Sequence, residues 1–294
     1  MNEYVLLRGA DLTMYNSMRI HSTCDTMYLP ASIDALTNLL ERFSGKRVVL
    51  LGRGSNVIFT REHYDENTIF ISTRLLNDIE ADGGVIHAQC GAELSDLAYF
   101  AMTQGSKGFE FLEDIPGTVG GALMMNAGTH NDTIANIVLQ VTYFSPAENS
   151  VLTVSQPEAA NFFYTRDSVF AREGCAVLSC GFRTSPGEYL EVLDRMLDIK
   201  RKRFAKQPRD YFNAGSVFKR PQKDGKDIYV WSLMEELGLR GYTVGSAQVS
   251  QKHPGFIVNL GGATCEDVLN LIEHCKKTVF QRFGVSLELE WKLI

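Results

Sequence analysis

Two glycine-rich segments constrain this chain more than any other feature of its sequence. The first, GRGSN at 52–56, directly follows the apolar run RVVLL at 47–51, which is typical of a buried strand. Glycine lets the backbone take positive φ and approach a ligand closely, and consecutive N–H groups can then form a concave anion site suited to a pyrophosphate. The alternative for an isolated GxG is a tight turn. Because Val57 begins a further strand candidate rather than a helix, the GxGxxG nicotinamide-binding fold is not predicted.

The second segment, IPGTVGGA, occupies positions 115–122 and is closely followed by Asn126-Ala127-Gly128. Five of its eight residues are Gly, Pro or Ala, which leaves little side chain to fill a core and much backbone free to approach a flat ligand. The alternative is a plain structural loop, which would be unusually rigid and bare. We therefore favour a loop that contacts a ligand.

Hydrophobic spacing predicts helices that alternate with strands. Helices are expected over 31–43, from 94 to the glycine at 105, and near 231–237. A long helix after Pro186 is expected to have four residues on one face: Leu190, Leu193, Leu197 and Phe204. Another is expected over 265–283, capped by Thr264, with five inward residues: Val268, Ile272, Cys275, Val279 and Phe283. Strands are expected at 47–51, 57–60, 68–72, 84–90, 136–145, 150–154, 176–183 and 255–260, and the alternating strand SLELEW closes the chain.

Composition excludes several classes of protein. The chain has 294 residues, of which 45% are hydrophobic and 22% charged, and a net charge of −6. It has no stretch of roughly 18 apolar residues, and its start lacks the pattern of a signal peptide, so we expect a cytoplasmic protein with no membrane partner. Its acidity argues against bulk binding of nucleic acid. Six dispersed cysteines without a CxxC pair predict buried thiols rather than disulfides or a metal site.

One local exception to this acidity is the segment 200–209, where six of ten residues are basic. Composition alone leaves three explanations open: a solvated helix face, a nucleic-acid patch, or a site that meets the phosphates of a small ligand.

Five blocks of sequence carry a resemblance to a known family. They are LGRGSNVIFT at 51–60, GFEFLEDIPGTVGGALMMNAG at 108–128, RDSVF at 166–170, KQPRDYFNAGSVFKRP at 206–221 and GVSLELEW at 284–291. In this order and spacing, the chain resembles the UDP-N-acetylenolpyruvoylglucosamine reductase (MurB) family of flavoproteins. The short spacing between Phe170 and Lys206 resembles the type that lacks an extra tyrosine-bearing substrate loop.

The resemblance implies a mixed α/β and α+β fold of three domains. Two N-terminal α/β subdomains, 1–72 and 73–186, would hold FAD non-covalently, and an α+β domain over 187–294 would bind the substrate. NADPH would reduce the flavin, which would pass hydride to the enolpyruvyl group of UDP-N-acetylglucosamine enolpyruvate. The product would be UDP-N-acetylmuramate, a peptidoglycan precursor for cell-wall biogenesis, cell shape and cell division. We expect a monomer.

The reaction makes chemical demands that specific residues could meet. Hydride arriving at the β-carbon leaves negative charge on the α-carbon and carboxylate, which a fixed cation can stabilise and a positioned hydroxyl can protonate. In the resemblance, Arg166 is that cation, Ser216 the proton donor and Glu290 a support for the enolic intermediate. From the residues alone, Ser216 could be a turn residue, Arg166 an exposed ion-pair partner of Asp167, and Glu290 a solvent-exposed side chain of its strand.

The same resemblance assigns the binding residues. Cofactor contacts are expected from the two glycine-rich segments and the loop after them: Gly52, Arg53, Gly54, Ser55, Asn56, Pro116, Gly117, Thr118, Gly120, Gly121 and Gly128. Substrate contacts are expected from three cations: Lys206, Lys219 and Arg220. The basic segment 200–209 would then meet phosphates, with Lys206 as a point charge.

The chain departs from the family pattern at several places. Arg220 stands where asparagine is common, Thr165 separates Tyr164 from Arg166, and NAGTHN replaces the more usual NAGAYG. These departures concern the substrate more than the cofactor. Two alternatives therefore stay open: an FAD-dependent oxidase or dehydrogenase acting on another substrate, and a non-catalytic paralogue that binds FAD or a UDP-sugar.

Overall fold

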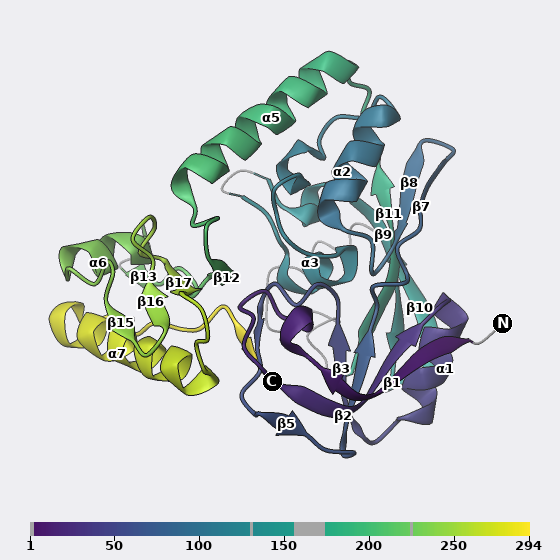
Figure 1. Cartoon of the computed structure of the whole chain (residues 1–294). Coiled ribbons are helices and arrows are strands. Elements are labelled where there is room, and N and C mark those ends of the chain that lie inside the picture. The colour runs from purple at the N-terminus through teal and green to yellow at the C-terminus, as the bar shows by residue number, and fades with distance from the viewer. Residues whose placement is uncertain (1–2, 130–131, 156–173, 224–225) are drawn as a thin grey trace. The chain divides into compact units, whose positions relative to one another are not determined.

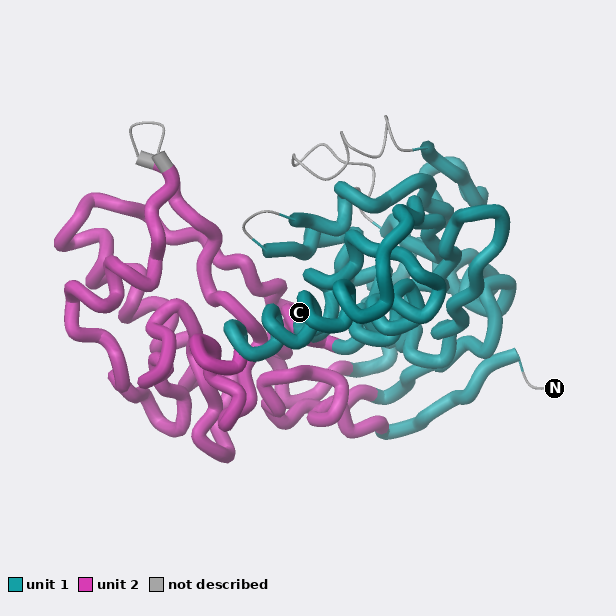
Figure 2. The backbone as a smooth tube through the Cα atoms, turned by 90° about the horizontal axis from the view of Figure 1, so that it is seen from above, with its two compact units in different colours: residues 1–9, 25–53, 65–203 teal, residues 10–24, 54–64, 204–294 magenta. Residues whose placement is uncertain are grey.

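The computed structural model describes residues 3–129, 132–155, 174–223 and 226–294. They form two compact units, and each unit combines separate stretches of the sequence (Figure 2). The first unit consists of Met1–Gly9, Asp25–Arg53 and Asp65–Arg203, and the second of Ala10–Cys24, Gly54–Tyr64 and Phe204–Ile294. Each unit has its own hydrophobic core. The division into three domains that we expect from the sequence stays a prediction.

One sheet of the first unit contains the strand that leads to GRGSN. Its strand order is β1-β2-β6-β3, with β1 at Tyr4–Asp11, β2 at Thr23–Pro30, β6 at Thr68–Ser72 and β3 at Arg47–Leu51. The β-branched and aliphatic residues of β3 and β6 pair in parallel, in the register Leu51↔Ser72. Helix α1 (Ile33–Arg42) begins at Ser32, whose side chain accepts a hydrogen bond from the Ala35 N–H.

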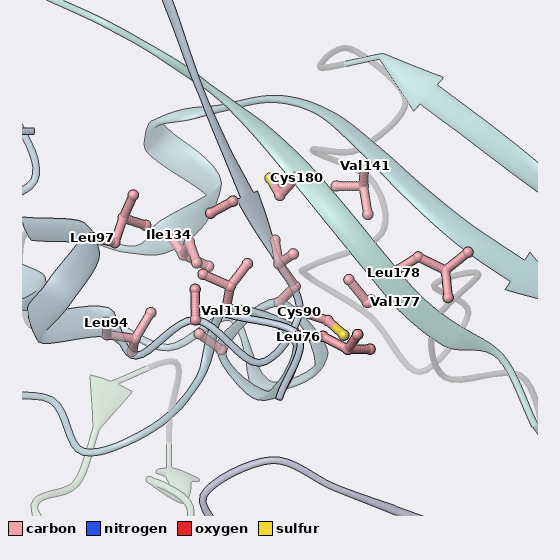
Figure 3. Close-up of a cluster of buried hydrophobic side chains, with 14 of the residues drawn as sticks. Leu76, Cys90, Leu94, Leu97, Val119, Ile134, Val141, Val177, Leu178 and Cys180 are labelled. Carbon is pink, nitrogen blue, oxygen red and sulfur yellow. The ribbon is translucent and has the colours of Figure 1, made fainter. Parts of the chain in front are cut away.

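The other sheet of the first unit is antiparallel. Its order is β10-β9-β11-β8-β7, with β10 at Ser150–Ser155, β9 at Val138–Ser145, β11 at Ala176–Arg183, β8 at Val85–Gln89 and β7 at Ile79–Asp82. Helix α3 (Val119–Met125) packs against β8 and β11 (Figure 1). Figure 3 shows part of the core of this unit, in which Val119, at the start of α3, and Cys90, just after β8, are buried. The remaining elements of this unit are α2 (Leu94–Thr103), the 3-10 turns η2 (Glu110–Leu112) and η3 (Ile134–Asn136), and most of α5 (Tyr189–Lys206).

The second unit is built on an antiparallel sheet and two helices. The sheet has the order β12-β17-β16-β15, with β12 at Phe212–Ser216, β17 at Phe256–Asn259, β16 at Ala247–Val249 and β15 at Thr243–Val244. Helix α7 (Cys265–Phe283) starts with a capping box between Thr264 and Asp267. The other elements are α6 (Val230–Glu236), the turn η1 (Thr13–Tyr15), the hairpin β13 (Gln222–Lys223) and β14 (Lys226–Asp227), β5 (His63–Tyr64), which pairs with the start of β2, and the parallel pair β4 (Val57–Ile58) and β18 (Lys292–Leu293).

Most of the elements expected from hydrophobic spacing are present within a few residues of their expected bounds, including β3, β6, α2, β11 and α7. The face of α5 that carries the expected apolar residues is largely exposed: Leu190 is 70% and Phe204 61% exposed, while Val192 and Met196 are buried. One detail of the expectation is wrong. The segment 286–291 does not form a regular strand but is held by an isolated bridge at Leu289 and by backbone hydrogen bonds.

The described residues contain neither a membrane-spanning helix nor a metal-binding cluster. No helix among them is long and apolar enough to cross a membrane. No cluster of His, Cys, Asp and Glu side chains among them could hold a metal ion. All six cysteines are thiols, and four are buried as expected: Cys24, Cys90, Cys180 and Cys275.

Candidate functional site: glycine-rich segments, Ser216 and Glu290

The start of the GRGSN segment lies against Thr118 in the first unit. A Cβ atom added at Gly52 would overlap the Thr118 hydroxyl, so the two glycine-rich segments can touch here only because position 52 has no side chain. Arg74 fixes this turn from the other side: its Nε donates to the Gly52 carbonyl at 3.3 Å and its Nη2 to the Arg53 carbonyl at 3.2 Å. The Arg53 side chain forms an ion pair with Glu93.

Backbone hydrogen bonds hold the second segment, 115–121, to the elements beside it. The Leu94 N–H donates to the Gly117 carbonyl at 3.1 Å, and the Gly120 N–H donates to the Cys90 carbonyl at 2.8 Å. A Cβ at Gly120 would lie 3.0 Å from the Cβ of Cys90, so glycine allows this close packing. Here the ligand-contacting loop expected from the sequence is in part a helix, because α3 begins at Val119.

The exposed side of this arrangement is bare backbone. Pro116 and Gly121 are exposed, and a Cβ at Gly121 would have only the Thr118 hydroxyl within 4 Å, at 3.6 Å. A surface of this kind lets a flat ring approach the main chain, and turns with successive N–H groups suit a phosphate. The residues at 52–53 and 116–121 therefore fit a flavin dinucleotide.

The rest of the GRGSN segment belongs to the second unit. Gly54 has a φ of +73°, and a Cβ there would overlap the carbonyl oxygen of Tyr15. The Ser17 N–H donates to the Gly54 carbonyl at 3.0 Å, so the segment 10–24 packs directly on this glycine. Ser55 is half-buried next to it.

Asn56 contacts the backbone segment that carries Glu290. Its Nδ2 donates to the Glu290 carbonyl at 3.1 Å, and its own carbonyl accepts from the Lys292 N–H at 2.9 Å. From the sequence we expect Asn56 to contact the cofactor, whereas its side-chain amide donates to a carbonyl of the protein. Asn56 thereby joins the end of GRGSN to the backbone of Glu290.

Ser216 is exposed at an irregular end of β12. The pairing of β12 with β17 shifts register between Asn213 and Ser216, at Gly215, whose φ is +80°. Asn213 stabilises this bend, because its Oδ1 accepts from the Gly215 N–H at 3.1 Å and its Nδ2 donates to the Pro208 carbonyl at 2.9 Å. Ser216 lies directly after this bend and is exposed.

Glu290 lies on the backbone segment beside Ser216. Its N–H donates to the carbonyl of Val217 at 2.9 Å, which is the residue after Ser216. Burial raises the pKa of the Glu290 carboxyl, although the charges of Lys219 and Arg220 oppose the rise. The simple expectation of a solvent-exposed Glu290 is therefore wrong, while Glu288, two residues earlier, is exposed.

The two cations after Ser216 line a cavity of about 410 Å³ in the second unit, together with Gln222, Ser286 and Glu288. Lys219 Nζ lies 3.4 Å from Glu288 Oε2. Arg220 Nη1 lies 3.7 Å from Asp227 Oδ2, and its guanidinium lies over the Tyr229 ring at 5.0 Å from the centroid. Arg220 is thus held by an acid and an aromatic ring.

The remaining predicted residues have varied surroundings. Lys206 is exposed at the end of α5. Gly128 is in a bridge with Thr133, where a Cβ would overlap the Asp132 carbonyl. Arg166, Thr165 and Tyr164 lie outside the described residues. In the basic segment 200–209, three of the cations expected to meet phosphates bind carboxylates of the protein instead: Lys200, Lys202 and Arg203.

Two supporting residues were not identified from the sequence. Arg74 holds the GRGSN turn, and Asn16 holds the segment against Gly54 through donation from its Nδ2 to the carbonyls of Leu12 and Ile20 at 3.2 and 3.0 Å. Both act on backbone atoms, and neither belongs to a hydrophobic period or a glycine-rich motif. The Asn-Ser-Met stretch at 16–18, which stands where the family commonly has an Asn-Thr pair, was the available signal for Asn16.

The raised pKa of Glu290 predicts a pH-dependent stability. The folded state holds the Glu290 proton more tightly than the unfolded chain, so this stabilisation is complete below the ordinary pKa and is lost as pH rises through the raised one. In Glu290→Gln this loss is absent. We expect the unfolding midpoint of the variant, relative to the unchanged protein, to be higher at about pH 8 than at about pH 4 in thermal melts. Glu288→Gln is the exposed control, and an equal difference at both pH values in Glu290→Gln would contradict the assignment.

Comparison with known proteins places this site in a class. Residues 25–155 match a family model described as "FAD binding domain". This span contains both glycine-rich segments whose geometry fits a flavin dinucleotide, and together they define an FAD-dependent oxidoreductase with an α+β FAD-binding fold.

The rest of the chain identifies the family. Residues 207–294 match the model "UDP-N-acetylenolpyruvoylglucosamine reductase, C-terminal domain". The enzyme of that name from Caldanaerobacter subterraneus is 35% identical over 100% of this chain and 95% of its own length, and that from Thermotoga maritima is 36% identical over 95% of each. The crystal structure of the MurB enzyme from Thermus caldophilus has a TM-score of 0.78 and 25% identity, covering 99% of this chain and 98% of its own. This chain belongs to the UDP-N-acetylenolpyruvoylglucosamine reductase family.

Proposed function

We propose that this protein reduces the enolpyruvyl group of UDP-N-acetylglucosamine enolpyruvate to give UDP-N-acetylmuramate, with FAD as bound cofactor and NADPH as reductant. The observation that carries this proposal is the placement of Ser216 and Glu290. An outward-facing hydroxyl at a bulge and a partly buried carboxyl lie on two segments joined by the hydrogen bond from Glu290 N–H to Val217. The relatives named above support the substrate.

The chemistry balances as the addition of one hydride and one proton across the C=C bond. Bound FAD supplies the hydride chemistry, between NADPH and the enolpyruvyl β-carbon. The protein must then stabilise the negative charge on the α-carbon and carboxylate and deliver the proton. We assign proton donation to the Ser216 hydroxyl and charge stabilisation to Arg166 and Glu290.

The pKa of Glu290 bears on its role. A raised pKa favours the protonated form of the carboxyl, which is the form that can donate a hydrogen bond to an enolate oxygen. The neighbouring cations oppose this rise. We assign Lys219 and Arg220, which line the cavity, to anionic groups of the substrate, and Lys206 to a phosphate.

We also propose that the protein works as a monomer in the cytoplasm, in the synthesis of peptidoglycan precursors that supports cell shape and division. The free-thiol chemistry of its six cysteines suits a reducing compartment. Size-exclusion chromatography of the purified protein measures the oligomeric state, and elution as a dimer would contradict this part of the proposal.

One spectroscopic experiment tests the function. The purified protein is expected to be yellow, with flavin bands that bleach on addition of NADPH without oxygen and recover on addition of UDP-N-acetylglucosamine enolpyruvate. Recovery with this substrate supports the proposal. Bleaching by an alcohol or sugar in place of NADPH would point to an oxidase or dehydrogenase, and a yellow protein without turnover would point to a non-catalytic paralogue. Substitution of NADH for NADPH gives the nicotinamide preference.

A further inference from the structure

Helix α5 is attached to the segment before the second glycine-rich loop by three ion pairs within the first unit. Arg195 Nη1 lies 3.5 Å from Glu110 Oε1, Lys200 Nζ lies 2.6 Å from Glu113 Oε1, and Arg203 Nε lies 3.0 Å from Asp114 Oδ2. Two of the three acids, Glu110 and Glu113, are buried, and Asp114 is half-buried. The helix therefore docks through these ion pairs as well as through the buried Val192 and Met196.

The contact of Arg203 includes the main chain. Its Nη2 donates to the carbonyl oxygen of Asp114 at 3.2 Å, in addition to the bond between its Nε and the carboxylate. The Arg203 side chain is only 20% exposed, so solvent screens the pair weakly. A guanidinium that binds both the carboxylate and the backbone carbonyl of one residue fixes the direction of the chain at that residue.

The residues after Asp114 are Ile115, Pro116 and Gly117 of the loop that fits the flavin. On its far side this loop is fastened by the bond from Leu94 N–H to the Gly117 carbonyl. On its near side, Pro116 has no N–H, and the Ile115 N–H donates to the Leu112 carbonyl at 3.1 Å, within the same turn. Arg203 ties the backbone of this turn to α5 at Asp114. One residue earlier, Lys200 and the Tyr99 hydroxyl bind the carboxylate of Glu113.

We propose that Arg203 and Lys200 of α5 are positioning residues for the flavin-binding loop, because Arg203 holds the backbone and carboxylate of Asp114 and Lys200 holds the carboxylate of Glu113 directly before it. The proposal rests on the proposed flavin contacts of residues 116–121. Neither matching family model covers α5, since one ends at residue 155 and the other begins at 207. Preorganising a loop raises ligand affinity because less ordering remains to be done on binding.

Lys200 is the less suitable residue to replace. The Glu113 Oε2 atom is buried and accepts no hydrogen bond from the described residues, so loss of Lys200 would leave a buried carboxylate without its cation. Arg203→Met is the main test, and Arg203→Lys keeps the charge but cannot reach both the carboxylate and the backbone carbonyl. Lys202→Met is the matched control, because Lys202 lies on the same helix and, among the described residues, pairs with the exposed Asp198 one turn earlier.

The measurements are the dissociation constant of FAD from each apoprotein, by flavin fluorescence well below the unfolding temperature, and the visible circular dichroism of the bound flavin. We expect a roughly tenfold weaker FAD affinity and altered flavin dichroism in Arg203→Met, a smaller effect in Arg203→Lys, and none in Lys202→Met. Unchanged affinity and dichroism in Arg203→Met would overturn the proposal, even if its melting temperature fell.

Two further outcomes keep the proposals distinct. If Arg203→Met does not fold, Arg203→Lys and Asp114→Asn carry the same test, and unchanged FAD affinity in both would overturn the positioning role. If the unchanged protein binds FAD but does not reduce the enolpyruvyl substrate, the proposed function fails while the positioning role is still decided by the affinities.

Discussion

Replacement of Ser216 by alanine is expected to leave NADPH-dependent bleaching of the flavin intact and to slow reoxidation by the enolpyruvyl substrate by roughly 10²–10⁴-fold, the usual scale of proton-transfer catalysis. The reason is the position of the hydroxyl. Ser216 is exposed at the bulge of β12, one residue before the carbonyl that binds Glu290 N–H. Its loss removes the proton donor but no core packing. Stopped-flow absorbance of the flavin band follows the two half-reactions separately.

The control for this experiment is Ser155→Ala, an exposed serine on β10 of the first unit. It is expected to leave both half-reactions unchanged. Solvent isotope effects give a second check, because proton transfer from Ser216 makes reoxidation of the unchanged protein slower in D₂O. Reoxidation at the unchanged rate in Ser216→Ala would exclude this residue as the proton donor.

The parts of the fold that could be predicted from sequence are those specified by local patterns. The apolar run 47–51 gave β3 with its bounds, and the three- and four-residue spacing from Val268 to Val279 gave the buried face of α7 with its Thr264 cap. Both elements bury their own apolar residues against neighbouring elements, so a period in the sequence is sufficient.

The orientation of α5 could not be predicted in the same way. Its apolar spacing places Leu190 and Phe204 on one face, but this face is exposed. The helix is held by the buried Val192 and Met196 and by ion pairs to Glu113 and Asp114, far away in sequence. Long-range pairing of charges leaves no period. The basic composition of 200–209 was consequently assigned to ligand phosphates, although three of its cations bind protein carboxylates.

The same difference between local patterns and long-range contacts applies to the candidate site. The glycines at 52, 54 and 120 were singled out because a glycine is read directly from the sequence. The hydrogen bond from Asn56 to the Glu290 carbonyl and the burial of the Glu290 carboxyl were not, because both depend on the tertiary fold. Asn56 and Glu290 lie 234 residues apart in the sequence and meet in the second unit. Interleaving of the segments 10–24 and 54–64 with the C-terminal third is likewise a property of the tertiary fold.

Replacement of Gly54 by alanine is expected to weaken FAD binding by roughly 100-fold, which corresponds to about 2.7 kcal/mol, and to lower the unfolding temperature. Two effects add. The φ of +73° costs an L-residue about 1–2 kcal/mol, and the new methyl group would overlap the Tyr15 carbonyl oxygen. A main-chain atom cannot rotate away as a side chain can, so the GRGSN turn itself must shift.

Gly45→Ala separates these two effects. Gly45 has a φ of +81°, similar to that of Gly54, but a Cβ there would meet no atom within 4 Å. Its replacement therefore carries the backbone cost without the overlap, and we expect lower stability with unchanged FAD affinity. Fluorescence titration of both apoproteins with FAD, below the unfolding temperature of either, gives the comparison. Equal affinities in the two variants would show that the packing of Tyr15 on Gly54 does not shape the cofactor site, whereas a loss confined to Gly54→Ala assigns the effect to that contact.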